Sequence, residues 1–118
     1  MSVLRSGIVN KIRYSAEAIQ DLEQIGDYIA EILKSPMVAL NTVNKIQDTI
    51  DKLANFPLIG SPLSNVVNMT TDYRYIVCGN YLVFYRTKTE VVFIDRVLFG
   101  RRDYLKILFS DMQGDDRV

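Results

Sequence analysis

Three short apolar runs dominate the second half of the chain, between Asp72 and Tyr104. Gly79-Asn80 separates the first two runs, and Thr87-Lys88-Thr89-Glu90 separates the last two. The runs are rich in Val, Ile, Tyr and Phe, which favour strands, and short polar separators of this kind favour tight turns. The pattern predicts an antiparallel meander whose strands cover Tyr73–Cys78, Tyr81–Arg86 and Val91–Leu98. Because apolar residues fall on both faces of these strands, the sheet needs a cover on each side.

In the first half of the chain, the spacing of apolar residues is first that of a short strand and then that of a helix. Lys11–Tyr14 alternates between polar and apolar positions, which predicts a strand. Ser15 is a suitable N-cap, and apolar residues at helical spacing predict a first helix from about Ala16 to Lys34. We expect its opposite face to be solvated, in preference to a binding surface; this face carries Glu17, Gln20, Asp21, Gln24, Asp27 and Glu31.

A second helix is predicted to begin at Pro36, behind Ser35 as its cap, and to end at Phe56-Pro57. Two helices with facing apolar stripes and a short connection form an antiparallel hairpin, which can cover one face of the sheet. Residues 57–71 are predicted to be an ordered loop in which Gly60 supplies an unusual backbone angle. Residues 101–109 are predicted to form a short closing helix. The predicted class is therefore α+β, with an N-terminal strand, a helical hairpin, a meander sheet of three to four strands and a short C-terminal helix.

Length and composition fit a single domain over residues 1–118, with residues 1–10 and 112–118 as loose termini. Cys78 is the only cysteine and lies in a strand pattern, so neither a disulfide nor a cysteine-based metal site is expected. No long apolar run or export leader is found, and we expect a cytoplasmic protein without membrane contact. No cofactor, metal or small-molecule ligand is expected.

The charges balance over the whole chain, with 14 basic and 14 acidic side chains, but they are distributed unevenly. Residues 72–106 carry seven basic and four acidic side chains, so the basic excess lies on the meander and on the segment that follows it. A polyanion or an acidic partner would bind there, although a solvated sheet edge could carry the same weak excess.

Four segments together resemble the RelE/ParE superfamily of toxins from bacterial type II toxin–antitoxin systems. They are KIRYSAEAIQDLEQIGDYI, PLIGSPL, YRYIVCGNYLVFYR and VVFIDRVLFGRRDY, and they span most of the chain from Lys11 to Phe109. The resemblance implies a small α+β domain that inhibits growth when free. It also implies a cognate antitoxin that wraps around the domain and masks its working surface.

The superfamily has two branches with different targets. Toxins that resemble RelE cleave messenger RNA on the ribosome and need basic groups around the scissile phosphate. This chain has no histidine, and it has Leu82 and Ile76 where that branch carries basic residues. The run from Arg96 to Asp103 is more similar to ParE toxins, which bind DNA gyrase without catalysis. We therefore prefer gyrase as the target, with a metal-independent mRNA endoribonuclease or an orphan without toxicity as the alternatives.

The resemblance and the charge pattern select a small set of candidate site residues. Residues expected to bind the target or the antitoxin are Arg74, Arg86, Arg96, Arg101, Arg102 and Lys106. If the chain is a nuclease, the catalytic candidates are Arg74, Arg86, Arg101, Arg102 and Tyr104. Each has a structural alternative: the arginines of the middle strands would then form salt bridges, and Tyr104 would pack and hydrogen-bond. Arg96 and Asp95 would each find a separate cross-strand partner, because neighbours in a strand face opposite ways.

Overall fold

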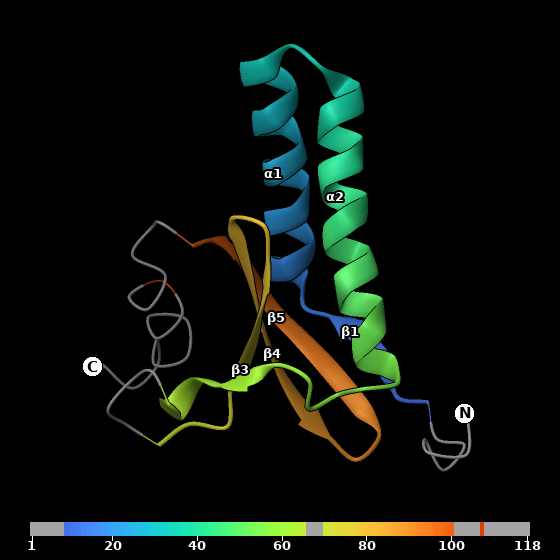
Figure 1. Cartoon of the computed structure of the whole chain (residues 1–118), viewed down its shortest axis with the longest axis vertical. Coiled ribbons are helices and arrows are strands. Elements are labelled where there is room, and N and C mark those ends of the chain that lie inside the picture. The colour runs from blue at the N-terminus through green and yellow to red at the C-terminus, as the bar shows by residue number, and fades with distance from the viewer. Residues whose placement is uncertain (1–8, 66–69, 101–106, 108–118) are drawn as a thin grey trace.

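The computed structural model describes residues 9–65, 70–100 and 107, and these residues form an α+β fold (Figure 1). The predicted fold class is confirmed. In chain order the elements are β1 (Lys11–Tyr14), α1 (Ala16–Leu33), α2 (Pro36–Asp51), a 3₁₀ turn η2 (Lys52–Ala54), β2 (Ser61–Pro62), a second 3₁₀ turn η3 (Leu63–Asn65), β3 (Arg74–Cys78), β4 (Tyr81–Lys88) and β5 (Val91–Phe99).

The sheet has the strand order β1-β5-β4-β3-β2. Strands β3, β4 and β5 form the predicted antiparallel meander. β1 lies parallel to β5, from Lys11 opposite Val91 to Tyr14 opposite Ile94. β2 adds two residues antiparallel to β3, so the antiparallel part of the sheet has four strands, within the three to four expected, and β1 adds a fifth. β2 comes from the segment predicted to be a loop.

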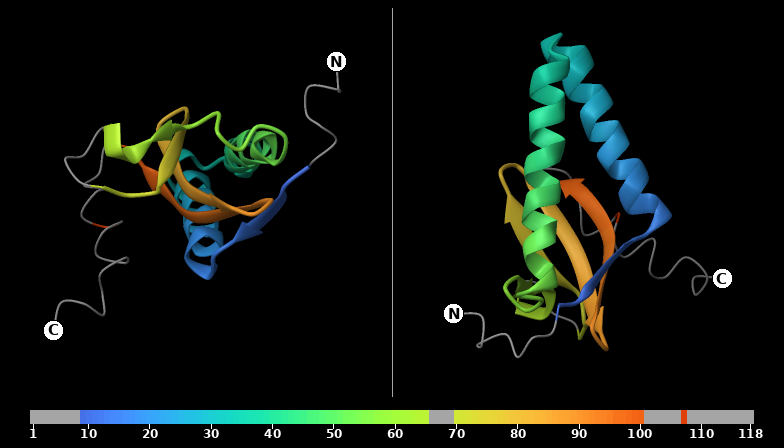
Figure 2. Two further views of the ribbon diagram at one scale, coloured as in Figure 1. Left: turned by 90° about the horizontal axis from the view of Figure 1, so that it is seen from below. Right: turned by 90° about the vertical axis from the view of Figure 1, so that its right-hand side faces the viewer.

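Serine residues begin both helices as the sequence predicts. The Ser15 hydroxyl accepts a hydrogen bond from the Ala18 amide at 2.9 Å, and the Ser35 hydroxyl accepts one from the Val38 amide at 3.2 Å. Such caps satisfy amides that have no partner within the helix. The two helices pack as an antiparallel hairpin that runs across one face of the sheet and extends past its end (Figures 1 and 2).

Two apolar clusters hold these layers together. The larger cluster joins the hairpin to one face of the sheet and includes Leu22, Ile46, Ile50, Val83 and Tyr85. The smaller cluster lies on the opposite face and consists of Leu63, Tyr73, Phe84 and Leu98. Ile107 packs against the smaller cluster, whereas the rest of the predicted closing helix lies outside the described residues. Both faces of the sheet are therefore covered, as their apolar character requires.

Gly60 is needed for space and not for an unusual backbone angle, so that part of the prediction is wrong. Among the described glycines only Gly79 has a positive φ, of 60°. A Cβ atom on Gly60 would lie 2.5 Å from the carbonyl oxygen of Tyr75 and 2.6 Å from the hydroxyl of Tyr85. The Tyr85 hydroxyl accepts a hydrogen bond from the Gly60 amide at 3.0 Å. This hydrogen bond holds the loop after the hairpin against β4, the middle strand of the sheet.

Within the described residues, no helix has the length and apolar character that crossing a membrane requires.

Candidate functional site

The described part of the chain contains three of the predicted site residues, one on each strand of the meander. Arg74 lies on β3, Arg86 on β4 and Arg96 on β5. Arg101, Arg102, Tyr104 and Lys106 lie outside the described residues. Arg86 and Arg96 are on neighbouring strands, yet their guanidinium groups turn to different partners.

Arg86 pairs with Asp95 across the two central strands. Its Nε lies 2.7 Å from one carboxylate oxygen of Asp95, and an Nη lies 3.4 Å from the other. The guanidinium also lies over the ring of Tyr73, 5.5 Å from the centroid, which is a cation–π distance. The Arg86 side chain is 43% exposed and that of Asp95 is 17% exposed. The pair is therefore at the surface on its arginine side and shielded on its carboxylate side.

The electrostatics of this cluster follow from its geometry. Burial, followed by the charge of Asp95, raises the pKa of Tyr73 to about 12, so its phenol stays protonated. The hydrogen bond with Asp95 raises the pKa of Arg86 above its ordinary value. A protonated tyrosine and a paired arginine are poor proton acceptors at neutral pH. The charge of Arg86 is largely compensated by Asp95, the one carboxylate in contact with its guanidinium among the described residues.

A β-bulge interrupts the pairing of β4 with β5 at Asp95, next to Arg96. Phe84 lies opposite Arg96 and Tyr85 opposite Ile94, which leaves Asp95 as the extra residue. Its carbonyl oxygen accepts a hydrogen bond from the Ser15 hydroxyl at 2.8 Å. Asp95 and Arg96 have separate partners, but only Asp95 has the predicted cross-strand partner, Arg86 on β4, whereas Arg96 pairs with a helix residue.

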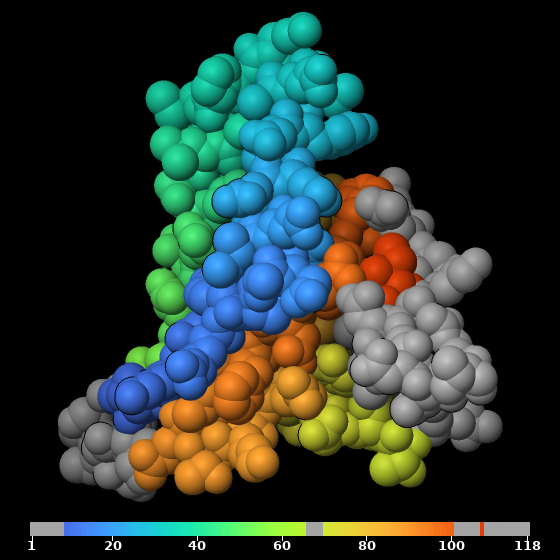
Figure 3. Space-filling model, turned by 180° about the vertical axis from the view of Figure 1, so that it is seen from behind, coloured from blue at the N-terminus to red at the C-terminus, as the bar shows by residue number. Residues whose placement is uncertain are grey.

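The partner of Arg96 is Asp21 on α1. The Nε atom and one Nη atom of Arg96 lie 2.8 and 2.9 Å from the two carboxylate oxygens of Asp21, which is bidentate geometry. The Val97 amide donates a third hydrogen bond to Asp21, at 2.9 Å. β1 ends opposite Ile94, so at this point Asp21 takes the place of a strand along the edge of β5. Figure 3 shows the surfaces of α1 and β5 side by side.

The prediction that this face of α1 is solvated is therefore wrong at Asp21, which is only 8% exposed. Sequence reasoning missed this role because Asp21 shares its helical face with exposed carboxylates. Its partner lies 75 residues away, and no local signal separates the buried carboxylate from its neighbours.

Arg74 has a third kind of environment. One of its Nη atoms donates to the carbonyl oxygen of Leu58 at 3.3 Å, which ties β3 to the loop after α2. Its Nε is buried and has no hydrogen-bond partner among the described residues. Over the same residues, no group of three side chains is arranged to hold a metal ion.

The comparisons with known proteins agree with this fold. Residues 12–104 match the family model for the ParE toxin of the type II toxin–antitoxin system parDE. A comparison with curated protein sequences found no match. The fold is similar to that in a chromosomal ParDE toxin–antitoxin system from P. aeruginosa, with a TM-score of 0.66 and 19% identity over 77% of this chain and 96% of that chain.

A second similar structure is the toxin–antitoxin complex RelBE2 from Mycobacterium tuberculosis. Its TM-score is 0.53 and its identity 18%, over 79% of this chain and 93% of that chain. At such identities the two structures show a shared fold. The family match covers most of the chain, and the chain therefore belongs to the ParE toxin family of type II toxin–antitoxin systems.

Proposed function

We propose that the chain inhibits growth by binding its target without catalysing a reaction, and that DNA gyrase is this target. The observation that carries the proposal is the pairing of the two arginines at the centre of the sheet. Arg86 is held by Asp95 and Arg96 by Asp21. RNA cleavage would require a base and cations around the nucleophile, the phosphate and the leaving group. Arginines already paired with carboxylates are poorly suited to that task.

The absence of histidine from the sequence supports the same choice. Tyr73, whose pKa is about 12, would be a weak substitute as a base. The zero formal net charge also suits a protein target better than a ribosomal one, because RNA binding depends on phosphate neutralisation.

An antitoxin is the second partner that we propose. Both similar structures belong to toxin–antitoxin systems, which supports a neutralising partner for this chain. We propose Arg101, Arg102 and Lys106 as the principal contacts with the target or the antitoxin, because they form a basic cluster just past β5. Arg74, Arg86 and Arg96 would support this surface from the sheet.

A gyrase assay tests the proposal. Purified chain should inhibit supercoiling of a relaxed plasmid by gyrase, and expression of the chain without a partner should stop growth. Normal supercoiling together with arrested growth would contradict gyrase as the target and would favour the ribosomal alternative. Undisturbed growth would favour an orphan that has lost toxicity.

A further inference from the structure

The second half of β5 has no neighbouring strand on the side of α1. β1 pairs with β5 only as far as Ile94. Ser15, the residue after β1, donates its amide to the carbonyl oxygen of Ile94 and its hydroxyl to that of Asp95, and α1 begins directly afterwards. No described strand therefore lies along this side of β5 from Arg96 to Phe99. The open edge of a strand can pair with the backbone of another chain.

The backbone groups of Val97 and Phe99 face this open edge. The Gly100 amide donates to the carbonyl oxygen of Asn80 at 2.7 Å, so alternate residues of this part of β5 face β4. Val97 and Phe99 must face away from β4, and the Val97 amide accordingly donates to Asp21. The Phe99 amide and the Val97 carbonyl oxygen have no hydrogen-bond partner among the described residues. A single residue of a parallel strand bonds to such a pair of groups, and β1 already lies parallel to β5.

A cavity of about 600 Å³ lies along the same edge, between β5 and α1. Its β5 wall includes Val97–Phe99, and its α1 wall includes Gln24, Ile25 and Tyr28. We call this feature the edge slot. Gln24 is exposed and Tyr28 is 63% exposed, so the slot is open to solvent on its α1 side. An incoming strand would therefore find unpaired backbone groups on one wall and side chains on the other.

The lining of the edge slot is apolar or electrically neutral. The rings of Phe99 and Tyr81 meet edge to face, with 5.7 Å between their centroids. Burial raises the pKa of Tyr81, so its phenol stays protonated. Among the described lining residues, Asp21 and Arg96 are the charged ones, and they neutralise each other. The slot therefore suits an uncharged peptide segment with an apolar side chain and does not attract phosphate.

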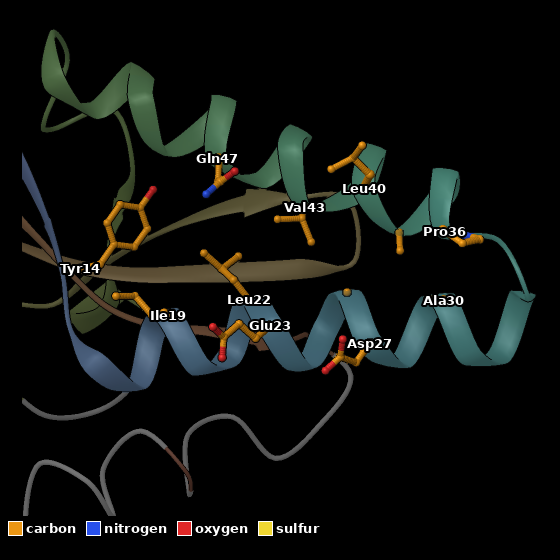
Figure 4. Close-up of a pocket in the computed structure, with 12 residues that line it drawn as sticks. Tyr14, Ile19, Leu22, Glu23, Asp27, Ala30, Pro36, Leu40, Val43 and Gln47 are labelled. Atoms are coloured by element: carbon orange, nitrogen blue, oxygen red, sulfur yellow. The ribbon is translucent and has the colours of Figure 1, made fainter.

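The larger hollow between α1 and α2 is different in kind (Figure 4). Its volume is about 750 Å³, and it is lined by Ile19, Leu22 and Val43, the first two on another face of α1. Both of its walls are helices, whose backbone groups bond within the helix. That hollow offers side chains alone, whereas the edge slot also offers the hydrogen-bonding groups of a strand.

We propose that the edge slot binds an extended segment of the target, DNA gyrase, which adds to β5 as a parallel strand in line with β1. The segment accepts a hydrogen bond from the Phe99 amide, donates one to the Val97 carbonyl oxygen and places an apolar side chain in the slot. β5 leads directly to Arg101 and Arg102, the proposed contacts with the target, so the edge slot continues that interface. This inference rests on the proposed function, because it assigns gyrase to a particular surface.

Proline and alanine at position 99 separate the backbone contact from the ring. Both substitutions remove the ring, but only Phe99→Pro removes the amide hydrogen that faces the slot. The β4–β5 ladder does not use this amide, so the strand pairing should persist. Biolayer interferometry with purified gyrase should show about tenfold weaker binding of Phe99→Pro than of Phe99→Ala, as expected for one lost hydrogen bond. Equal affinities of two folded variants would overturn the proposal.

Val77 on β3 provides a matched control at the other side of the sheet. The Tyr73 carbonyl oxygen accepts the Leu63 amide, so the alternate residues of β3, including Val77, face away from β4. β2 pairs only with Arg74 and Tyr75, which leaves Val77 on an open edge, 58% exposed. Val77→Pro and Val77→Ala should bind gyrase equally well. A loss with Val77→Pro as large as that with Phe99→Pro would overturn the assignment to the edge slot.

Amide hydrogen exchange of the unmodified chain gives a test that needs no variant. The Phe99 amide should exchange at least about tenfold more slowly in the complex with gyrase than in the free chain, because it becomes hydrogen-bonded. The Val77 amide should exchange at the same rate in both states. An unchanged rate at Phe99 in the complex would overturn the proposal even if Phe99→Pro does not fold.

The outcomes separate this inference from the proposed function. If the unmodified chain does not bind gyrase, the proposed function and the inference both fail. If it binds gyrase without protection of the Phe99 amide, only the inference fails. If Phe99→Pro binds gyrase normally but is no longer neutralised by the protein encoded beside its gene, the inference also fails, and the edge slot belongs to the antitoxin.

Discussion

Asp21 of α1 and Arg96 of β5 form a bidentate ion pair in which both side chains are largely buried, with 9% and 16% of their surface exposed. The same carboxylate accepts a hydrogen bond from the Val97 amide, at the edge of β5 just beyond the end of β1. The Asp21 side chain thus joins the hairpin to the sheet and provides a hydrogen-bond acceptor for a backbone amide of β5 that is not paired with β1.

Replacing Asp21 should therefore destabilise the fold. Asp21→Asn keeps the shape but leaves the Arg96 guanidinium buried without its anion, and we expect a loss of about 3 kcal/mol in the free energy of unfolding. Urea denaturation measures this loss. Asp27→Asn, at an exposed position of the same helix, should change stability by less than about 0.5 kcal/mol. Similar stabilities of the two variants would contradict the structural role of Asp21.

Gly60 and Gly79 should respond differently to alanine. At Gly60 the new methyl group would collide with Tyr75 and Tyr85, so Gly60→Ala should cost at least about 2 kcal/mol. At Gly79 there is space around the Cβ position, and only the positive φ is unfavourable, at about 1 kcal/mol. Thermal denaturation of both variants tests this order, and a larger loss at Gly79 would contradict the close approach described for Gly60.

Tyr73 should make stability fall at high pH. Its pKa of about 12 in the folded protein lies above the ordinary value of 10, so the folded state retains the phenolic proton when the unfolded chain loses it. This contribution is fully present below pH 10 and is lost as the pH rises to about 12. Its size is at most about 2.7 kcal/mol, because one pKa unit corresponds to about 1.36 kcal/mol.

Denaturation curves between pH 9 and pH 12 measure the effect. Tyr73→Phe should flatten this part of the stability profile, whereas Tyr28→Phe, at an exposed position, should leave it unchanged. A profile with Tyr73→Phe as steep as that of the unmodified chain would contradict the assignment.

Arg101→Ala combined with Arg102→Ala should reduce toxicity without lowering the melting temperature, because the basic cluster past β5 is proposed to contact the target. Growth after induction and thermal denaturation of the purified variant are the two measurements. Lys11→Ala with Arg13→Ala on β1 is a matched control, since these residues are exposed and are not among the proposed contacts. Full toxicity of a stably folded Arg101/Arg102 variant would remove these residues from the site.

Local patterns in the sequence predicted most of the fold. Ser15 and Ser35 cap the two helices, and Gly79-Asn80 joins β3 to β4, because these signals depend on a few adjacent residues. The parallel pairing of β1 with β5 and the pairing of β2 with β3 were not predicted. They join segments that are distant in sequence, and β2 consists of a serine and a proline, which carry no strand signal.

In the candidate site, too, local patterns were predicted and contacts between distant segments were not. The neighbouring positions of Asp95 and Arg96 suggested separate partners, which the structure contains. The identity of one partner, Asp21, depends on the tertiary packing of α1 against β5. Hydrophobic periodicity assigned Asp21 to the solvated face because it cannot distinguish a carboxylate that faces solvent from one that faces an arginine.

We propose that this ParE-family toxin binds its target and does not cut RNA. Primer extension on a single message in a translation extract, with and without the purified chain, tests it most directly. We expect intact message at concentrations of the chain that inhibit gyrase supercoiling. Cuts within codons in the ribosomal A site, reduced by Arg86→Ala or by Arg101→Ala with Arg102→Ala, would contradict it.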